Sequence, residues 1–283
     1  MRIQVSVLKF KFLMFSFMRI KLIKIVLFAA MVSFPGSFIV LGQDNSLYEK
    51  RIFISGQDSL LYRVMFPEDF DPSGKYPLIF FLHGAGERGD DNEKQLMHGG
   101  SFFASEFNRK NYPAIVIFPQ CKTDNYWANV VFSTNDDGSR NFDFNPTEEA
   151  KPPMSCLLEL IDSYLSEPYT DLQRVYIGGL SMGGMATFEL LYRKPEIFAA
   201  AFPVCGGGNP DFINAGIRNV KIRAFHGEED TVVKPVLSVK MIEAFKVAGA
   251  DASLTLYPGV GHNAWDYVFK EEGLLPWLFS CYK

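Results

Sequence analysis

Cysteine and histidine are scarce in this sequence, with four residues of each in a chain of 283. No two cysteines form a Cys-x-x-Cys pair, and the spacing that holds a structural or catalytic metal ion is missing. We therefore expect no metal site and no cofactor. If the chain is exported, four cysteines allow three complete disulfide pairings, and buried free thiols are the alternative; these residues are Cys121, Cys156, Cys205 and Cys281.

Acidic residues are absent from the first 42 positions, which contain six basic residues. An apolar run over residues 25–41 follows the last of these, and small residues occupy the positions that a cleavage site after Gly42 requires. A proline and a glycine interrupt the run, which disfavours a permanent transmembrane anchor. Residues 1–42 are therefore predicted to be a signal peptide, and residues 43–283 a single domain that is secreted or periplasmic.

Positive charge is also in short supply once the predicted signal peptide is removed. The complete chain has 28 basic and 32 acidic residues, so the mature part keeps 22 basic residues against 32 acidic ones, a net charge of −10. Nucleic acid and anionic membranes attract positively charged surfaces. We expect neither as a partner, and no stable membrane insertion after processing. The sequence leaves the oligomeric state open.

Short runs of β-branched and aromatic residues alternate with stretches of helical periodicity. This alternation predicts an α/β fold with a mostly parallel, eight-stranded sheet and helices on both faces. The first two strands are close enough in sequence to form an antiparallel hairpin across Gly56. We expect strands at residues 51–55, 60–66, 77–82, 114–118, 174–178, 199–204, 220–225 and 252–257, and helices at 154–165, 182–193 and 236–247.

The longest stretch without predicted secondary structure covers residues 121–153, which are mostly polar with several embedded aromatic residues. Irregular segments of this length are often functional, and we expect this one to overhang the ligand site. Trp127 is a candidate for stacking on a sugar or phenolic ring of a substrate. The alternative is that it pins the segment to the body of the domain.

Ser181 lies at the centre of a Gly-x-Ser-x-Gly motif, Gly179-Leu180-Ser181-Met182-Gly183, between an expected strand and an expected helix. This strand-to-helix context makes the motif informative, because it presents the serine on a tight turn at a helix N-terminus. The two glycines leave room for that turn. We therefore predict that Ser181 is a catalytic nucleophile.

A serine hydroxyl needs a neighbouring base to act as a nucleophile at neutral pH. His83 and His226 each end an expected strand, and His98 lies in a polar loop before the serine. His262 lies in a glycine-containing loop after the last expected strand. It gives the order serine, acid, histidine of this strand–turn–helix arrangement, so we predict that His262 is the base.

The histidine in turn needs a carboxylate that fixes its tautomer. Three consecutive acidic residues follow the strand at 220–225, namely Glu228, Glu229 and Asp230. Acyl transfer also needs fixed N–H donors for the developing oxyanion. The backbone N–H groups of Met182, directly after the nucleophile, and of Ala85, after the strand at 77–82, are the candidates.

These residues together resemble the α/β-hydrolase superfamily, and within it the group that spans dienelactone-hydrolase-like proteins, prolyl-oligopeptidase catalytic domains, and feruloyl and acetylxylan esterases. In that group the acid stands three residues after the glycine of a His-Gly pair, which selects Asp230, with Glu228 as runner-up. Dienelactone hydrolases proper use a cysteine nucleophile, whereas this chain has Ser181. The resembling segments are 81–89, 179–184, 226–233 and 261–262.

The resemblance implies a secreted serine hydrolase that cleaves carboxylic esters through an acyl-enzyme. Only about fifteen residues separate Val204 from Val220, where many lipases insert a helical cap, so we expect no large cap domain and an open site. An open site in an acidic, exported protein favours a bulky polar ester, and we expect acylated carbohydrate. The alternatives are a prolyl-oligopeptidase-like peptidase and a non-catalytic binding protein.

Overall fold

The structure is a computed structural model that describes residues 45–136, 138, 140–146 and 149–283. The predicted signal peptide lies outside the described residues. No helix within the described part of the chain has the length and apolar character needed to cross a bilayer.

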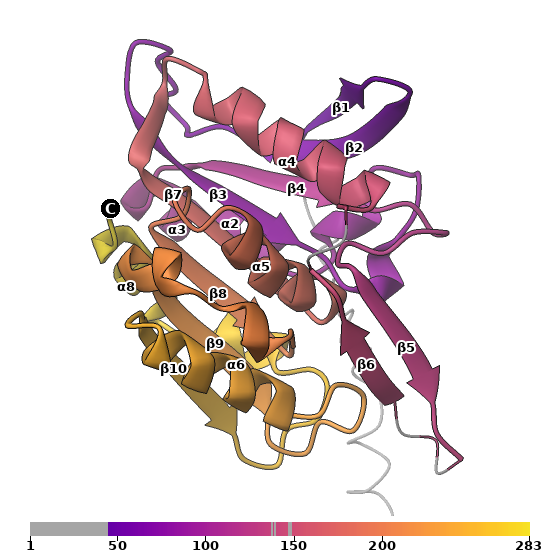
Figure 1. The fold of residues 1–283 in the computed structure, drawn as a ribbon. Helices are drawn as coiled ribbons and strands as arrows, with labels where there is room; N and C mark the ends of the chain where they lie inside the picture. Colours follow the sequence, from indigo (N-terminus) through magenta and orange to yellow (C-terminus); the bar gives the residue numbers. More distant parts are fainter. Residues whose placement is uncertain (1–44, 137, 139, 147–148) are drawn as a thin grey trace, which may run out of the picture. The chain divides into compact units, whose positions relative to one another are not determined.

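The centre of the domain is an eight-stranded sheet with the strand order β1-β2-β4-β3-β7-β8-β9-β10 (Figure 1). The strands β1 and β2 form an antiparallel hairpin, β2 pairs antiparallel with β4, and the remaining pairs are parallel. Each predicted strand has its counterpart, so the predicted α/β fold is confirmed. The bounds are Glu49–Ser55, Asp58–Met65, Tyr76–Leu82, Ile115–Gln120, Thr170–Leu180, Ala200–Val204, Lys221–Gly227 and Asp251–Tyr257.

Helices cover both faces of the sheet, because alternate residues of its central strands are apolar on either side. Leu78 and Phe80 of β3 lie in one buried cluster with residues from α4, α5 and α6. Ile79 and Phe81 lie in a second cluster with residues from α2, α7 and α8. The helices are α2 Gly100–Ala104, α3 Glu106–Asn111, α4 Pro152–Leu165, α5 Met182–Arg193, α6 Val236–Val247, α7 Trp265–Val268 and α8 Leu274–Ser280.

The segment expected to be irregular contains a second, two-stranded antiparallel sheet, so that expectation is wrong in part. Its strands are β5, Val130–Thr134, and β6, Arg140–Phe144. Apolar and polar residues alternate along β6, and Phe142 and Phe144 pair with Phe132 and Val130 of β5, so one face of the hairpin is largely apolar. The hairpin stands on the side of the domain toward which the parallel strands point (Figure 1).

All four cysteines are buried and free. Of the two alternatives left open by the sequence, the structure therefore has the unpaired thiols. Burial raises the pKa of the Cys121 and Cys205 thiols to about 12. These two thiols thus stay protonated at neutral pH and have little nucleophilic character.

Candidate active site

Ser181 occupies the turn between β7 and α5, with φ of 52° and ψ of −113°. A positive φ is strained for a residue with a side chain, and here it is the sharp turn that exposes the hydroxyl. A Cβ on Gly179 would lie 2.5 Å from the carbonyl oxygen of Gly183, and a Cβ on Gly183 would collide with the carbonyl oxygen of Leu82. Only glycine fits at these two positions.

His262, in the loop after β10, meets the serine directly. Its Nε2 lies 2.8 Å from Ser181 Oγ, and its Nδ1 lies 2.6 Å from Asp230 Oδ2. This loop passes very close to the end of β9. A Cβ on Gly227 would collide with the carbonyl oxygens of Val260 and Gly261. The structure thus brings together the three side chains chosen as nucleophile, base and acid.

Asp230 is the only one of the three consecutive carboxylates that contacts His262 among the described residues; Glu228 and Glu229 are exposed. Its Oδ1 accepts hydrogen bonds from the backbone N–H groups of Val232 and Val233, at 2.9 and 3.0 Å. Burial acts to raise the pKa of Asp230, but hydrogen bonds from His226 and His262 outweigh it and hold the pKa well below its usual range. Asp230 is therefore a carboxylate at neutral pH.

His226 is a site residue that the sequence reasoning set aside. Its Nδ1 lies 2.8 Å from Ser238 Oγ, and its Nε2 lies 2.8 Å from the carbonyl oxygen of Val233 and 3.2 Å from Asp230 Oδ2. Ser238 Oγ lies in turn 2.9 Å from the carbonyl oxygen of Gly206. His226 Nε2 faces two acceptor oxygens, so it donates.

His226 is fully buried, and these contacts hold its ring against the Asp230 carboxylate. The sequence contains one signal for His226, its position at the end of a strand and before a glycine. That position does not show that the His226 ring turns toward Asp230.

The two candidate oxyanion donors flank the serine. Ala85 is the first residue of a 3-10 helix, η1 (Ala85–Glu87), and Met182 is the first residue of α5. Backbone N–H groups at the first position of a helix have no acceptor within that helix. A Cβ on Gly84 would lie 3.5 Å from Ser181 Cβ, which places this loop against the nucleophile.

Two side chains hold the Ala85 loop in place. The Arg88 guanidinium donates from Nε to the carbonyl oxygen of Ala85 at 2.9 Å and from Nη1 to that of Asn125 at 3.1 Å. His83 Nε2 accepts from the backbone N–H of Cys121 at 2.9 Å, and burial lowers the pKa of His83 to about 4. His83 is therefore a neutral, structural residue.

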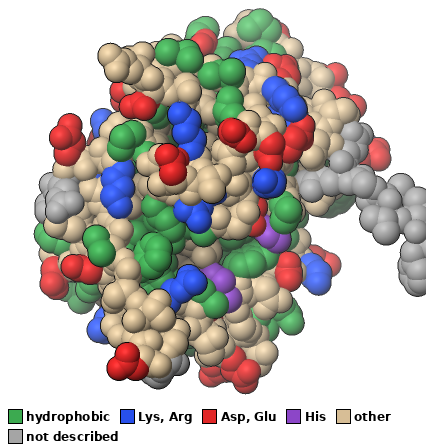
Figure 2. All heavy atoms as spheres, turned by 90° about the vertical axis from the view of Figure 1, so that its right-hand side faces the viewer, with side chains coloured by type: hydrophobic (Ala, Val, Ile, Leu, Met, Phe, Trp, Pro, Cys, Tyr) green, Lys and Arg blue, Asp and Glu red, His purple; other side chains and the backbone are tan. Residues whose placement is uncertain are grey.

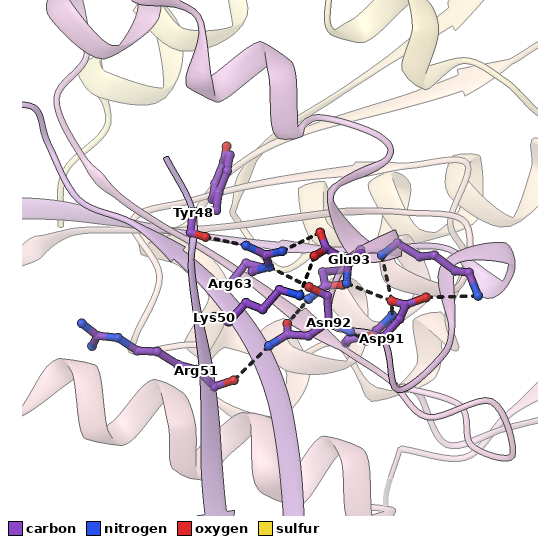
Figure 3. A network of polar contacts seen from close by, with 10 residues as sticks. Tyr48, Lys50, Arg51, Arg63, Asp91, Asn92 and Glu93 are labelled. Carbon is purple, nitrogen blue, oxygen red and sulfur yellow. Dashed lines mark hydrogen bonds and ion pairs between the residues drawn. The ribbon is translucent and has the colours of Figure 1, made fainter. Parts of the chain in front are cut away.

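A buried polar network fixes the end of the same loop against the sheet edge (Figure 3). Arg63 of β2 donates to the carbonyl oxygens of Tyr48 and Asn92, both at 2.6 Å, and pairs with Glu93. Gln120, at the end of β4, accepts from the backbone N–H of Asn92 at 2.7 Å. Charged hydrogen bonds of this kind are among the strong ones, so the network ties Asn92 and Glu93 to β2 and β4.

Trp127 does not lie where a substrate could stack on it. The side chain is fully buried, with its ring centroid 5.5 Å from that of His83. The stacking role expected for Trp127 is therefore a poor match to its position, since a ring enclosed by the core presents no face to a ligand. Burial agrees instead with the alternative, that Trp127 pins its segment to the domain.

One group of possible metal ligands occurs among the described residues, formed by Cys205, His226 and Asp230 with ligand atoms within 4.8 Å of one another. Both ring nitrogens of His226 already have hydrogen-bond partners, and Asp230 holds His262. We therefore assign these three residues to the hydrogen-bonding environment of the Asp230 carboxylate.

One family model and two relatives match parts of this chain. The model of the Dienelactone hydrolase family matches residues 128–265. The bifunctional acetylxylan esterase/xylanase XynS20E of Neocallimastix patriciarum is 30% identical over 191 residues, which is 68% of this chain and 23% of that protein. A putative dipeptidyl aminopeptidase of Schizosaccharomyces pombe is 29% identical over 125 residues, 44% of this chain and 12% of that protein. The chain thus spans less than a quarter of each relative.

Two solved structures share the fold. A thermostable esterase superposes with a TM-score of 0.74 at 30% identity, covering 84% of this chain and 64% of that chain. A ferulic acid esterase superposes with a TM-score of 0.61 at 18% identity, covering 82% and 97%. With the eight-stranded sheet and the strand–turn–helix geometry at Ser181, these likenesses show that the chain belongs to the α/β-hydrolase superfamily, in the group that includes the dienelactone hydrolase family.

Proposed function

We propose that this protein is a serine esterase that cleaves carboxylic esters through an acyl-enzyme formed on Ser181. The observation that carries the proposal is the continuous chain of contacts from Ser181 Oγ to His262 Nε2 at 2.8 Å and from His262 Nδ1 to Asp230 Oδ2 at 2.6 Å. Such a chain lets the imidazole accept the serine proton while the carboxylate stabilises the resulting imidazolium.

In the first half of the reaction, Ser181 Oγ attacks the ester carbonyl carbon and His262 takes the hydroxyl proton. The N–H groups of Ala85 and Met182 stabilise the oxyanion, a contribution of about 3 kcal/mol for each donor. The tetrahedral intermediate then collapses, and His262 passes its proton to the departing alcohol oxygen. In the second half, His262 activates a water molecule that hydrolyses the acyl-enzyme and regenerates Ser181.

The substrate class that we propose is an acyl group on carbohydrate, of the feruloyl or acetyl type. Support comes from the named relatives, which include an acetylxylan esterase/xylanase and a ferulic acid esterase. Between β8 and β9 the chain forms only two short 3-10 helices, Pro210–Phe212 and Ala215–Asn219. This connection is too short for a cap domain, which agrees with a site open to a bulky ester.

Export is part of the same proposal, and it is supported by the basic, acid-free N-terminus and its apolar run. A serine peptidase is the second candidate, because a putative dipeptidyl aminopeptidase is among the relatives.

The test compares purified wild type with Ser181→Ala on ethyl acetate, ethyl ferulate, acetylated xylo-oligosaccharide and a proline-linked peptide amide. We expect wild type to hydrolyse esters and Ser181→Ala to lose that activity by at least about 10⁴-fold. Cleavage of the peptide amide with negligible ester hydrolysis would favour the peptidase. No turnover of any of them by wild type would indicate a binding protein.

A further inference from the structure

Three aromatic side chains lie on and beside the β5–β6 hairpin, and one of them, Phe132, is exposed, unlike Trp127. Phe132 of β5 pairs across the strands with Phe142 of β6, and their ring centroids are 6.3 Å apart. The ring of Tyr126 lies 5.8 Å from that of Phe132. We call these three residues, Tyr126, Phe132 and Phe142, the aromatic row.

One face of the hairpin is divided into a buried half and an exposed half. Val130 and Phe144 form the cross-strand pair nearest the domain and are buried with Met185 of α5. On the same face, one pair further out, Phe132 keeps 51% of its surface exposed. The buried pair anchors the hairpin, and the next pair on that face, with Phe132 exposed and Phe142 partly buried, continues the apolar surface outward.

The aromatic row begins beside the catalytic residues. The Tyr126 hydroxyl lies 3.9 Å from the sulfur of Met185, whose backbone N–H donates to the Ser181 carbonyl oxygen at 3.0 Å. The Arg88 guanidinium lies 6.0 Å from the centre of the Tyr126 ring and also holds the carbonyl oxygen of Ala85. Tyr126 is therefore in contact with α5 and with the arginine that holds the Ala85 loop, and these two elements carry the candidate oxyanion donors.

Hydrophobic side chains and histidine side chains come to the surface together on the face of the molecule that Figure 2 shows. Two polar side chains, Thr134 and Arg140, form the next cross-strand pair on the same face of the hairpin as the Phe132–Phe142 pair. Burial raises the pKa of the Tyr126 phenol, and the nearby cations Arg88 and Arg140 act in the opposite direction. Apolar ring faces beside hydrogen-bonding groups suit a ligand that alternates apolar and polar surface, as a sugar ring does.

We propose that the aromatic row is a binding platform for the sugar rings of the esterified carbohydrate chain, on the alcohol side of the substrate. This inference deepens the proposed function and rests on it. A row of rings on a hairpin, with Phe132 half-exposed, suits a chain of sugar rings, whereas a single acyl group would need an enclosing pocket. The axial C–H groups of each sugar stack on an aromatic face, and the sugar hydroxyls stay solvated or bind the neighbouring polar side chains.

The test is Phe132→Ala, with Val131→Ala as its matched control. Val131 is 71% exposed and lies on the opposite face of the same strand, so both variants remove an exposed apolar side chain from one hairpin. Three substrates are compared. Acetylated xylo-oligosaccharide has rings on the alcohol side of the ester, ethyl ferulate has a ring on the acyl side, and ethyl acetate has no ring. We expect Phe132→Ala to lower kcat/KM about 5-fold or more on the oligosaccharide only, and Val131→Ala to change none.

A second measurement separates this inference from the proposed function. In the Ser181→Ala background, calorimetry with unacetylated xylo-oligosaccharide should show binding that Phe132→Ala weakens by a similar factor, even if wild type proved not to be an esterase. Equal behaviour of the Phe132 and Val131 variants would overturn the platform. A loss confined to ethyl ferulate, a loss on all three esters, or a dimer that Phe132→Ala dissociates would also overturn it.

Discussion

At the scale of single residues, the chemistry depends on how Asp230 and His262 are held. Asp230 accepts two backbone N–H groups on one oxygen and two imidazoles on the other, which fixes the carboxylate before the substrate arrives. His262 keeps 20% of its side chain exposed in a loop, so its removal should leave the fold intact.

For the base, we predict that His262→Ala lowers kcat/KM for ethyl acetate by at least about 10⁴-fold. Thermal unfolding should stay near that of wild type, because the exposed loop loses little packing. Retention of most of the activity would show that another group accepts the serine proton.

For the acid, Asp230→Asn should reduce kcat by about 10⁴-fold, because an amide no longer selects the productive imidazole tautomer. Glu228→Gln is the matched control, since Glu228 is an exposed carboxylate two positions away. Parallel turnover assays decide the assignment: a larger loss in the Glu228 variant would transfer the role of the acid to Glu228.

Asp230 also makes stability depend on pH. Its pKa is held below the value of about 3.9 that it has in the unfolded chain, so its charge stabilises the native state above that pH. This contribution is lost as the pH falls below about 4. We expect the melting temperature of wild type to drop between pH 5 and pH 3 more steeply than that of Asp230→Asn. Identical slopes would contradict the lowered pKa.

His226 is predicted to be a positioning residue that acts through Asp230. His226→Gln removes the ring that lies 3.2 Å from Asp230 Oδ2, so Asp230 is held less firmly against His262. We expect kcat to fall about 10-fold with KM unchanged. A purely structural role would instead lower the melting temperature and leave kcat near that of wild type.

At the scale of elements, glycines decide where the β7–α5 turn lies. Gly183→Ala puts a Cβ against the Leu82 carbonyl oxygen, whereas a Cβ on Gly273 meets nothing within 4 Å. We expect Gly183→Ala to lower the free energy of unfolding by about 3 kcal/mol, or to prevent folding, and Gly273→Ala to remain near wild type. Urea unfolding measures both, and equal stability of the two variants would contradict the close approach.

The elements also show what could be predicted from the sequence. Continuous apolar runs and helical periodicity were enough for the sheet and for α4, α5 and α6, because burial on both faces leaves a strong pattern. The β5–β6 hairpin was missed because its strands are only five residues each within a polar stretch. The contact of His226 with Asp230 depends on the orientation of a side chain, which no spacing reveals.

At the scale of the whole molecule, the basic N-terminal segment and the apolar run that follows it predict export. We predict that the full chain, expressed in a host with a secretory pathway, is recovered outside the cytoplasm with Gln43 at its N-terminus. Intact-mass measurement checks this. Recovery of the uncleaved chain in the membrane fraction would show that residues 25–41 anchor the protein instead.

The most direct test of the central claim is covalent labelling of the nucleophile. Wild type is treated with a fluorophosphonate, digested and analysed by mass spectrometry. The proposed mechanism predicts one phosphonyl adduct on Ser181, no adduct in Ser181→Ala, and much slower labelling of His262→Ala. Labelling that is equal in wild type and Ser181→Ala, or absent from wild type, would contradict it.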